Sequence, residues 1–271
     1  MGILLDALAT RKILISDGAW GTMLQGMGMT CDDCPEEWNV SHADEVKSVA
    51  KAYADAGSDL ILTDTFGGTS CKLKKMGYGD KVKEFNAAGA TNSLEAAPSA
   101  IIAGSVGPTG EFLEPYGDMT AAEMEAVFTE QISAMLEAGL KVICVETMTA
   151  IEEAACAIKA SKKLDPSVDV ICTMTFDATS NGFRTMMGVD PARAAKELVE
   201  AGADVIGSNC GNGIENMIGI AAELRANTAV PILIHANAGM PVLKDGETVF
   251  EQTPEDMAAK VKEVVDAGAN L

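Results

Sequence analysis

A repeated unit constrains the fold of this 271-residue chain more than any other feature of its sequence. Each copy consists of Ala-Gly, an apolar run and a polar pair, and the pair falls seven and eight residues beyond the glycine. Three complete copies run from Ala56-Gly57 to Asp64-Thr65, from Ala138-Gly139 to Glu146-Thr147 and from Ala201-Gly202 to Asn209-Cys210. A fourth begins at Ala267-Gly268, and its frame would place the polar pair four and five positions past Leu271. The repeat predicts strands that present polar residues where they end.

Seven apolar runs bounded by polar or glycine residues predict strands. They lie at Ile13–Ser16, Leu60–Leu62, Ala100–Val106, Val142–Val145, Val168–Thr175, Val205–Ser208 and Val230–Ile234. Segments between them have helical periodicity, and several follow residues that start helices, such as Thr120, Asp190 and Thr253. Examples are Ala43–Ala56, Ala121–Ala138, Ala150–Lys163, Pro191–Ala201 and Pro254–Ala267. This alternation predicts an α/β fold with right-handed crossovers and a parallel sheet.

The strand ends favour a barrel over an open doubly wound sheet. Polar residues follow nearly every predicted strand, and chemistry contributed by all strands at one face is typical of a barrel. The length suits one barrel and no linker-like stretch interrupts it, so we expect residues 1–271 to form a single domain. An eighth strand begins after Gly268 and is not completed, which predicts a TIM (β/α)8-type barrel truncated before that strand. Seven strands would leave edges near Ile13 and Ile234, where a homodimer could form.

Composition argues against several classes of partner. Apolar residues make up 48% and aromatic residues 4%, as expected for a core of buried parallel strands. Forty acidic and twenty basic residues give a net charge of −20, which would repel nucleic acid. The sequence has neither an apolar run of about 18 residues nor the basic start of a signal peptide. We therefore expect a cytoplasmic protein with no membrane partner.

The cysteines and histidines give weaker signals. Seven cysteines are an odd number, and Cys144 and Cys172 lie in apolar runs, so we expect reduced thiols. Cys31 and Cys34 form one C-x-x-C pair without a partner pair, which argues against a zinc ribbon. The only two histidines, at positions 42 and 235, are expected to be structural.

Three residues at the expected strand ends could carry chemistry. Asp17 follows the first strand and could hold an ammonium, while the backbone at Gly18 could approach a carboxylate, although an ordinary strand-to-helix turn has the same pattern. Glu146 follows Val142–Val145, and the cost of burying an unpaired carboxylate favours the barrel mouth. Cys210 is either an inert thiol or a metal ligand.

Six segments of this chain, in order over nearly its whole length, carry a family resemblance. They are Asp17–Gln25, Thr63–Phe66, Gly104–Gly110, Glu146–Met148, Gly207–Gly211 and Asn237–Pro241. Together they resemble the motifs of the homocysteine S-methyltransferase family, which includes the N-terminal module of cobalamin-dependent methionine synthase and betaine–homocysteine methyltransferase. Phe112–Pro115 is more similar to the methionine synthase branch.

The resemblance implies a fold, a metal and a substrate. It implies a TIM barrel in which Cys210 is the first of three thiolates that hold a catalytic zinc. The other two, in a Gly-Gly-Cys-Cys-Gly motif, are absent from this sequence. It implies further that the amino group of homocysteine binds to Asp17 and Glu146. The substrate carboxylate would bind near Gly18 and the loop of Thr63, Asp64 and Thr65.

The function expected from this resemblance is zinc-dependent transfer of a methyl group to the thiol of homocysteine, giving methionine. With one thiolate of three, the chain as it stands is expected to be inactive. Two alternatives remain open, namely a relative that acts on another thiol or selenol, and a catalytically silent module that binds an amino acid. The methyl donor would be free or carried by a partner such as a corrinoid protein.

Overall fold

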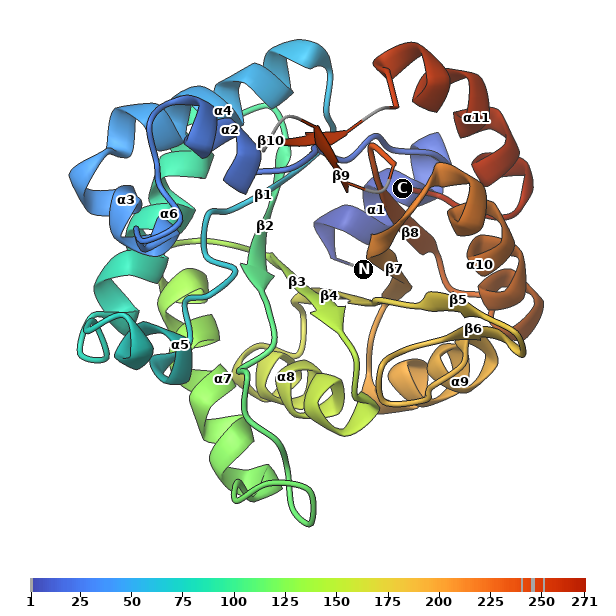
Figure 1. Cartoon of the computed structure of the whole chain (residues 1–271). Coiled ribbons are helices and arrows are strands. Elements are labelled where there is room, and N and C mark those ends of the chain that lie inside the picture. The colour runs from blue at the N-terminus through green and yellow to red at the C-terminus, as the bar shows by residue number, and fades with distance from the viewer. Residues whose placement is uncertain (1, 240, 245–246, 251) are drawn as a thin grey trace.

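Six parallel strands form one curled sheet, with helices around its outside (Figure 1). The structure is a computed structural model that describes residues 2–239, 241–244, 247–250 and 252–271. The sheet has the order β1 (Leu60–Leu62), β2 (Ile101–Val106), β3 (Val142–Met148), β4 (Asp169–Met174), β7 (Val205–Gly213) and β8 (Ile232–Asn237). Two antiparallel hairpins stand apart, β5 (Asp177–Thr179) with β6 (Gly182–Arg184), and β9 (Pro241–Lys244) with β10 (Glu247–Phe250). Met240, in the last resembling segment, lies outside the described residues.

Most of the helices form the outer layer, and one lies against the inner face of the sheet. They are α1 (Ile3–Arg11), α2 (Gly21–Gly26), α3 (Pro35–Ser41), α4 (Ala43–Ala56), α5 (Ser70–Lys75), α6 (Val82–Ala96), α7 (Ala121–Glu137), α8 (Ile151–Leu164), α9 (Pro191–Ala201), α10 (Ile214–Asn227) and α11 (Pro254–Asp266). Leu4 and Leu8 of α1 share a buried cluster with inward side chains of the strands, among them Val142 and Leu233. This cluster fills the interior of the barrel below the carboxyl ends of the strands.

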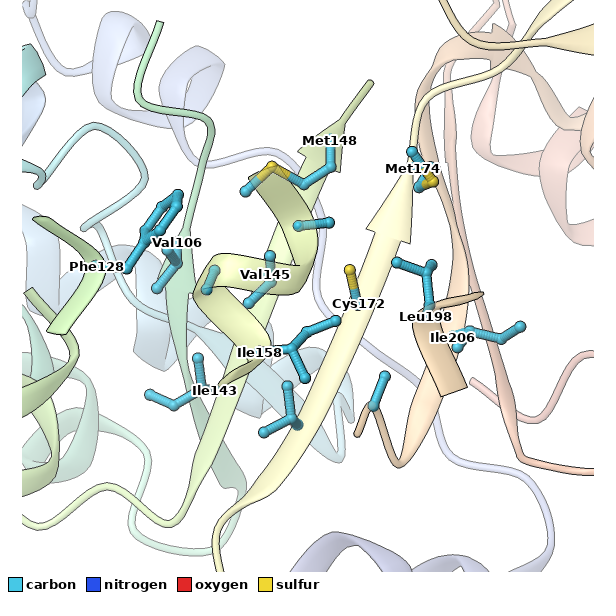
Figure 2. Close-up of a cluster of buried hydrophobic side chains, with 14 of the residues drawn as sticks. Val106, Phe128, Ile143, Val145, Met148, Ile158, Cys172, Met174, Leu198 and Ile206 are labelled. Atoms are coloured by element: carbon cyan, nitrogen blue, oxygen red, sulfur yellow. The ribbon is translucent and has the colours of Figure 1, made fainter. Parts of the chain in front are cut away.

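The outward side chains of the strands pack against the helices. Figure 2 shows Ile143, Cys172 and Ile206 of the strands among helix side chains such as Phe128 of α7 and Leu198 of α9. Inward and outward residues alternate along each strand, as the pleat of a sheet requires. Both faces of the sheet are therefore apolar toward the amino ends of the strands, which explains the uninterrupted apolar runs of the sequence.

The four glycines of the repeat adopt the same backbone conformation. Gly57, Gly139, Gly202 and Gly268 have φ values of 100°, 111°, 113° and 117°, in the left-handed region that glycine enters without steric cost. Each follows the end of a helix and leads into the next strand position. The predicted helix starts are also confirmed: Thr120 and Thr253 form capping boxes, and Asp190 accepts a hydrogen bond from the N–H of Arg193.

The expected count of seven strands is wrong by one. Residues 13–16 contribute only an isolated bridge between Ser16 and Leu60. The carboxylate of Asp59 accepts the N–H of Ile15 at 2.9 Å, while the carbonyl of Ile15 accepts from both Asp59 and Leu60. The side chain of Asp59 thus accepts a hydrogen bond that a backbone carbonyl would accept in a regular strand.

The edges expected near Ile13 and Ile234 are bridged at their lower ends by the last residues of the chain. Leu14 N–H donates to the carbonyl of Asn270 at 2.9 Å, and Ile234 N–H donates to that of Leu271 at 3.0 Å. Asn270 N–H in turn donates to Ile232 at 2.8 Å. These amides have hydrogen-bond partners within the chain, so the expectation that both edges are unpaired is wrong there. A homodimer stays a prediction without that support.

None of the described helices has the length and apolar character needed to cross a bilayer. All seven cysteines are free thiols, and Cys34, Cys144, Cys156 and Cys172 are buried.

Candidate functional site

Polar side chains form a layer above the apolar interior, at the carboxyl ends of the strands. Ser105, Glu146 and Thr173 each lie two residues beyond an inward apolar residue of the same strand, and Asn209 lies four residues beyond one. Because side chains alternate along a strand, these polar groups also point inward. The mouth of the barrel is therefore lined by groups from neighbouring strands.

Asp17 lies buried at this mouth with its carboxylate fixed by hydrogen bonds. Its Oδ2 accepts the N–H of Leu62 at 2.8 Å and the indole Nε1–H of Trp20 at 2.9 Å. Burial raises the pKa of Asp17 to about 6, against the lowering effect of these donors. The neighbouring Gly18 lies close to Tyr53, because a Cβ on Gly18 would come within 3.0 Å of the tyrosine hydroxyl.

Glu146 faces the barrel interior rather than the outer helices. Its Oε1 accepts the hydroxyl of Ser105 at 2.5 Å, and its Oε2 accepts the amide of Asn209 at 3.1 Å. Burial and, to a smaller extent, the nearby charge of Asp17 raise the pKa of Glu146 to about 7, against the lowering effect of the Ser105 hydroxyl. Two neighbouring carboxyl groups with raised pKa values, of which Asp17 also raises that of Glu146, are a favourable place for a cation.

The loop of Thr63, Asp64 and Thr65 is buried beside this pair. The Thr63 and Thr65 hydroxyls lie 2.7 Å apart, and Thr65 Oγ1 also donates to the carbonyl of Ser105 at 2.7 Å. Asp64 is only 6% exposed, and its Oδ2 has no hydrogen-bond partner among the described residues. Burial, with a smaller effect from Glu36, raises the pKa of Asp64 well above its ordinary value. The two hydroxyls are thus occupied, and burial disfavours the ionised form of the Asp64 carboxyl.

Cys210 lies at the surface of the same mouth in a strained conformation. Its φ is 57°, and Thr147, whose Oγ1 lies 3.9 Å from the sulfur, has a φ of 60°. Left-handed backbone is uncommon for non-glycine residues and an outlier for a β-branched one. Each residue sits in a register shift, between Val145 and Met148 in β3 and between Asn209 and Gly213 in β7. Strands expected to end at residues 145 and 208 therefore continue through irregular segments that carry the polar pairs.

Among the groups that the sequence analysis did not single out, Asn209 is the most connected. Its amide bonds to Glu146, Thr147 and Thr173, and its Nδ2 lies 3.5 Å from the sulfur of Cys210. The repeat contained the signal for it, because Asn209 occupies the same place in its unit as Asp64 and Glu146 do in theirs. Ser105 had no such signal.

His235 follows Leu233 on the inner face of β8 and pairs in register with Asn209. Its Nε2 is buried without a partner among the described residues, and burial lowers the pKa of His235 to about 4. The ring is therefore uncharged near neutral pH, and the structural role expected for His235 stays a prediction.

The donor set for a metal is incomplete in the part of the chain that the structure describes. No group of three or more His, Cys, Asp and Glu side chains is placed to hold a metal ion there. Although Cys210 is an exposed residue, partial burial of its sulfur raises the pKa of the thiol, and the charge of Glu146 adds to this effect while the Thr147 hydroxyl opposes it. One thiol with a raised pKa does not fit a site that needs thiolate ligands.

Comparison with known proteins decides the family. The family model described as homocysteine S-methyltransferase matches residues 14–271. The chain belongs to this family. Methionine synthases of Mycobacterium tuberculosis (strain ATCC 25618 / H37Rv) and Mycobacterium leprae (strain TN) are each 27% identical over 275 residues. The matches cover 94% of this chain, and it spans 22% of the length of each of these relatives.

Solved structures share the fold of this family member. The metallated form of the homocysteine methyltransferase MmuM from Escherichia coli matches with a TM-score of 0.79 at 20% identity, over 99% of this chain and 93% of that one. The carboxyl transferase domain of Rhizobium etli pyruvate carboxylase matches with a TM-score of 0.54 at 15% identity, over 95% of this chain and 39% of that one. The α/β fold is thus shown to match the barrel of the homocysteine methyltransferases, with its sheet represented by six strands.

Proposed function

We propose that this chain forms the homocysteine-binding barrel of an S-methyltransferase that converts homocysteine to methionine. The observation that carries the proposal is the meeting of Asp17, Glu146 and Cys210 at one mouth, in a member of the homocysteine S-methyltransferase family. The two carboxyl groups suit the ammonium of homocysteine, and the thiol suits a position beside its sulfur.

In this proposal the ammonium of homocysteine binds between Asp17 and Glu146. Each carboxyl has its pKa raised by burial, so an arriving cation would restore the ionised form of both. Hydrogen bonds from Leu62 to Asp17 and from Ser105 to Glu146 fix the two carboxyls before the substrate arrives. Binding would therefore require little rearrangement.

The substrate carboxylate is proposed to lie near Gly18 and the loop of Thr63, Asp64 and Thr65. The raised pKa of Asp64 supports this placement, since burial favours a protonated carboxyl that can donate to the substrate, whereas an ionised one would repel it. Because the two threonine hydroxyls are occupied, the Asp64 carboxyl and backbone groups are the proposed contacts.

The homocysteine sulfur is proposed to lie beside Cys210. Asn209 Nδ2 lies within reach of both Glu146 Oε2 and Cys210 Sγ, so the amine site and the thiol flank one amide. We propose zinc dependence for a site with three thiolates, of which the described residues supply Cys210 alone. Zinc would then bind tightly only where two further thiolates are present.

The methyl donor is proposed to approach from the mouth, free in solution or carried by a partner such as a corrinoid protein. The loops after β2 and β4 leave large apolar side chains exposed, including Tyr116 at 81% and Met186 at 83%. Such side chains suit contact with a bulky donor or its carrier.

A methyl-transfer assay tests the proposal against its alternatives. The chain would be compared with a form extended beyond Leu271 by a strand that ends in Gly-Gly-Cys-Cys-Gly. Each would receive zinc, L-homocysteine and one of three donors, namely methylcobalamin, betaine or S-methyl-L-methionine. We expect methionine from the extended form and its loss on Cys210→Ala.

Acceptor competition separates the remaining readings. Faster methylation of another thiol or selenol would favour the alternative acceptor, and binding of homocysteine without turnover by any form would favour a silent module. Equal turnover after exhaustive chelation would contradict zinc dependence.

A further inference from the structure

The side-chain amide of Asn209 connects its own strand, β7, to β3 and β4 at the mouth. Asn209 is 2% exposed. Its Oδ1 accepts the N–H of Thr147 at 2.9 Å and the hydroxyl of Thr173 at 2.8 Å. Its Nδ2 donates to Thr147 Oγ1 at 2.8 Å and to Glu146 Oε2 at 3.1 Å, and lies 3.5 Å from Cys210 Sγ. The amide therefore uses its donors and its acceptor fully.

Two of the residues that the Asn209 side chain contacts have unfavourable backbone conformations. Thr147 and Cys210 both have left-handed φ, and each lies at an irregularity in its own strand. A β-branched residue resists this conformation, so surrounding contacts must impose it. Asn209 contacts Thr147 at both its N–H and its hydroxyl, which fixes the orientation of this residue.

We infer that Asn209 is a positioning residue that locks the irregular segments of β3 and β7 together, so that the Glu146 carboxylate and the Cys210 sulfur face one substrate. The part of this inference that concerns substrate rests on the proposed function. The lock itself rests only on the contacts of Asn209 and on the two left-handed residues. An ordinary buried asparagine would stabilise the fold without setting the affinity for an amino acid.

A double-mutant cycle tests the lock. Thr147→Gly removes both the steric cost of the left-handed backbone and the hydroxyl that Asn209 contacts, so less depends on Asn209 in this background. We expect Asn209→Ala to lower the urea midpoint less than half as much in the Thr147→Gly background as in the wild type. Equal losses in both backgrounds would overturn the lock. The control is Asn92→Ala, which removes a buried amide that donates to the carbonyl of Asn39 at 2.9 Å. It should lower the urea midpoint by the same amount in both backgrounds.

Calorimetric titration with L-homocysteine tests positioning. We expect Asn209→Ala to weaken binding about tenfold, the effect of losing a hydrogen bond to a charged group. The control for binding is Ser161→Ala, which removes a buried hydroxyl that donates to the carbonyl of Ala157 within α8 at 2.9 Å. It should change the affinity by less than about twofold, because distant sites act independently. If Asn209→Ala does not fold, Asn209→Ser keeps a small polar side chain that is too short to reach both Thr147 and Glu146, adds no charge, and is expected to weaken binding to the same extent.

The outcomes separate this inference from the proposed function. Unchanged affinity in a folded Asn209 variant of a protein that binds homocysteine overturns positioning. If the wild type does not bind homocysteine, the proposed function and the positioning role fail together, and the double-mutant cycle alone still decides the lock.

Discussion

Replacing Glu146 with glutamine is expected to stabilise the ligand-free protein while removing its affinity for an amino acid. Burial raises the pKa of Glu146 from 4.5 to about 7. Glutamine fits the same contacts, since its oxygen can accept from Asn209 and its amide can donate to the Ser105 hydroxyl. The variant therefore removes an unfavourable buried charge and keeps the hydrogen bonds.

The size and pH dependence follow from linkage. The folded pKa lies above the unfolded one, so the wild type is most stable below pH 4.5 and loses stability as pH rises through about 7. At about 1.4 kcal/mol for each pKa unit, this loss approaches 3 kcal/mol at pH 8 and is about 1 kcal/mol at pH 5. Urea unfolding of Glu146→Gln should show a gain of about 2–3 kcal/mol at pH 8 that shrinks towards pH 5.

A matched control has the opposite sign. Hydrogen bonds from Thr120 lower the pKa of Glu123, so Glu123→Gln should be slightly less stable than the wild type at pH 8. A loss of stability in Glu146→Gln at pH 8, or a gain that is the same at pH 5 and pH 8, would refute the argument that an ionised Glu146 is costly in the empty site.

Three further outcomes are expected. Gly207→Ala should destabilise by at least about 3 kcal/mol in urea unfolding, because its Cβ would lie 1.9 Å from the backbone oxygen of Leu233. Thr120→Ala should lower stability by about 1 kcal/mol through loss of a capping box, measured in the same way. After dialysis, elemental analysis of the 271-residue chain should find far less than one equivalent of zinc, since described residues supply Cys210 alone.

Each of these outcomes has a control or a contrary result. Gly26→Ala meets nothing within 4 Å and should be nearly neutral, so equal effects at Gly26 and Gly207 would contradict the packing argument. An unchanged Thr120→Ala would mean that the capping box contributes nothing to α7. Stoichiometric zinc that survives dialysis and persists in Cys210→Ala would show that the ligand assignment is wrong.

Local physics allowed much of the fold to be predicted from the sequence. The Ala-Gly units mark the end of a helix and the start of a strand position, and the structure gives all four glycines left-handed φ. Thr120, Asp190 and Thr253 cap their helices as their residue types predict. Such signals depend on a few neighbouring residues and are readable without tertiary structure.

The errors arose where distant groups decide the local structure. The side chain of Asp59 takes the N–H of Ile15, which reduces a predicted strand to a bridge. The strand ends expected at residues 145 and 208 continue through irregular segments that hydrogen bonds of Asn209 hold together. An apolar run shows where a strand is buried, but not where a contact from another strand bends it.

For the site, the sequence indicated the residues but not how they are coupled. Asp17, Glu146 and Cys210 were chosen because each follows an apolar run, and their roles stay proposals. The effect of Asp17 on the pKa of Glu146 and the contacts of Asn209 with Glu146 and Thr147 join segments that are far apart in the chain. These contacts could not be read from spacing.

Proton release on substrate binding tests the central claim most directly. Titration of L-homocysteine into the protein at pH 6.5, in two buffers of different ionisation enthalpy, gives the number of protons released. With pKa values of about 6 for Asp17 and about 7 for Glu146, ammonium binding between them should release about one proton. N-acetyl-L-homocysteine, which lacks the ammonium, should bind at least tenfold more weakly, by about 1.4 kcal/mol or more. Equal affinity for the two compounds, or binding of L-homocysteine without proton release, would contradict the account.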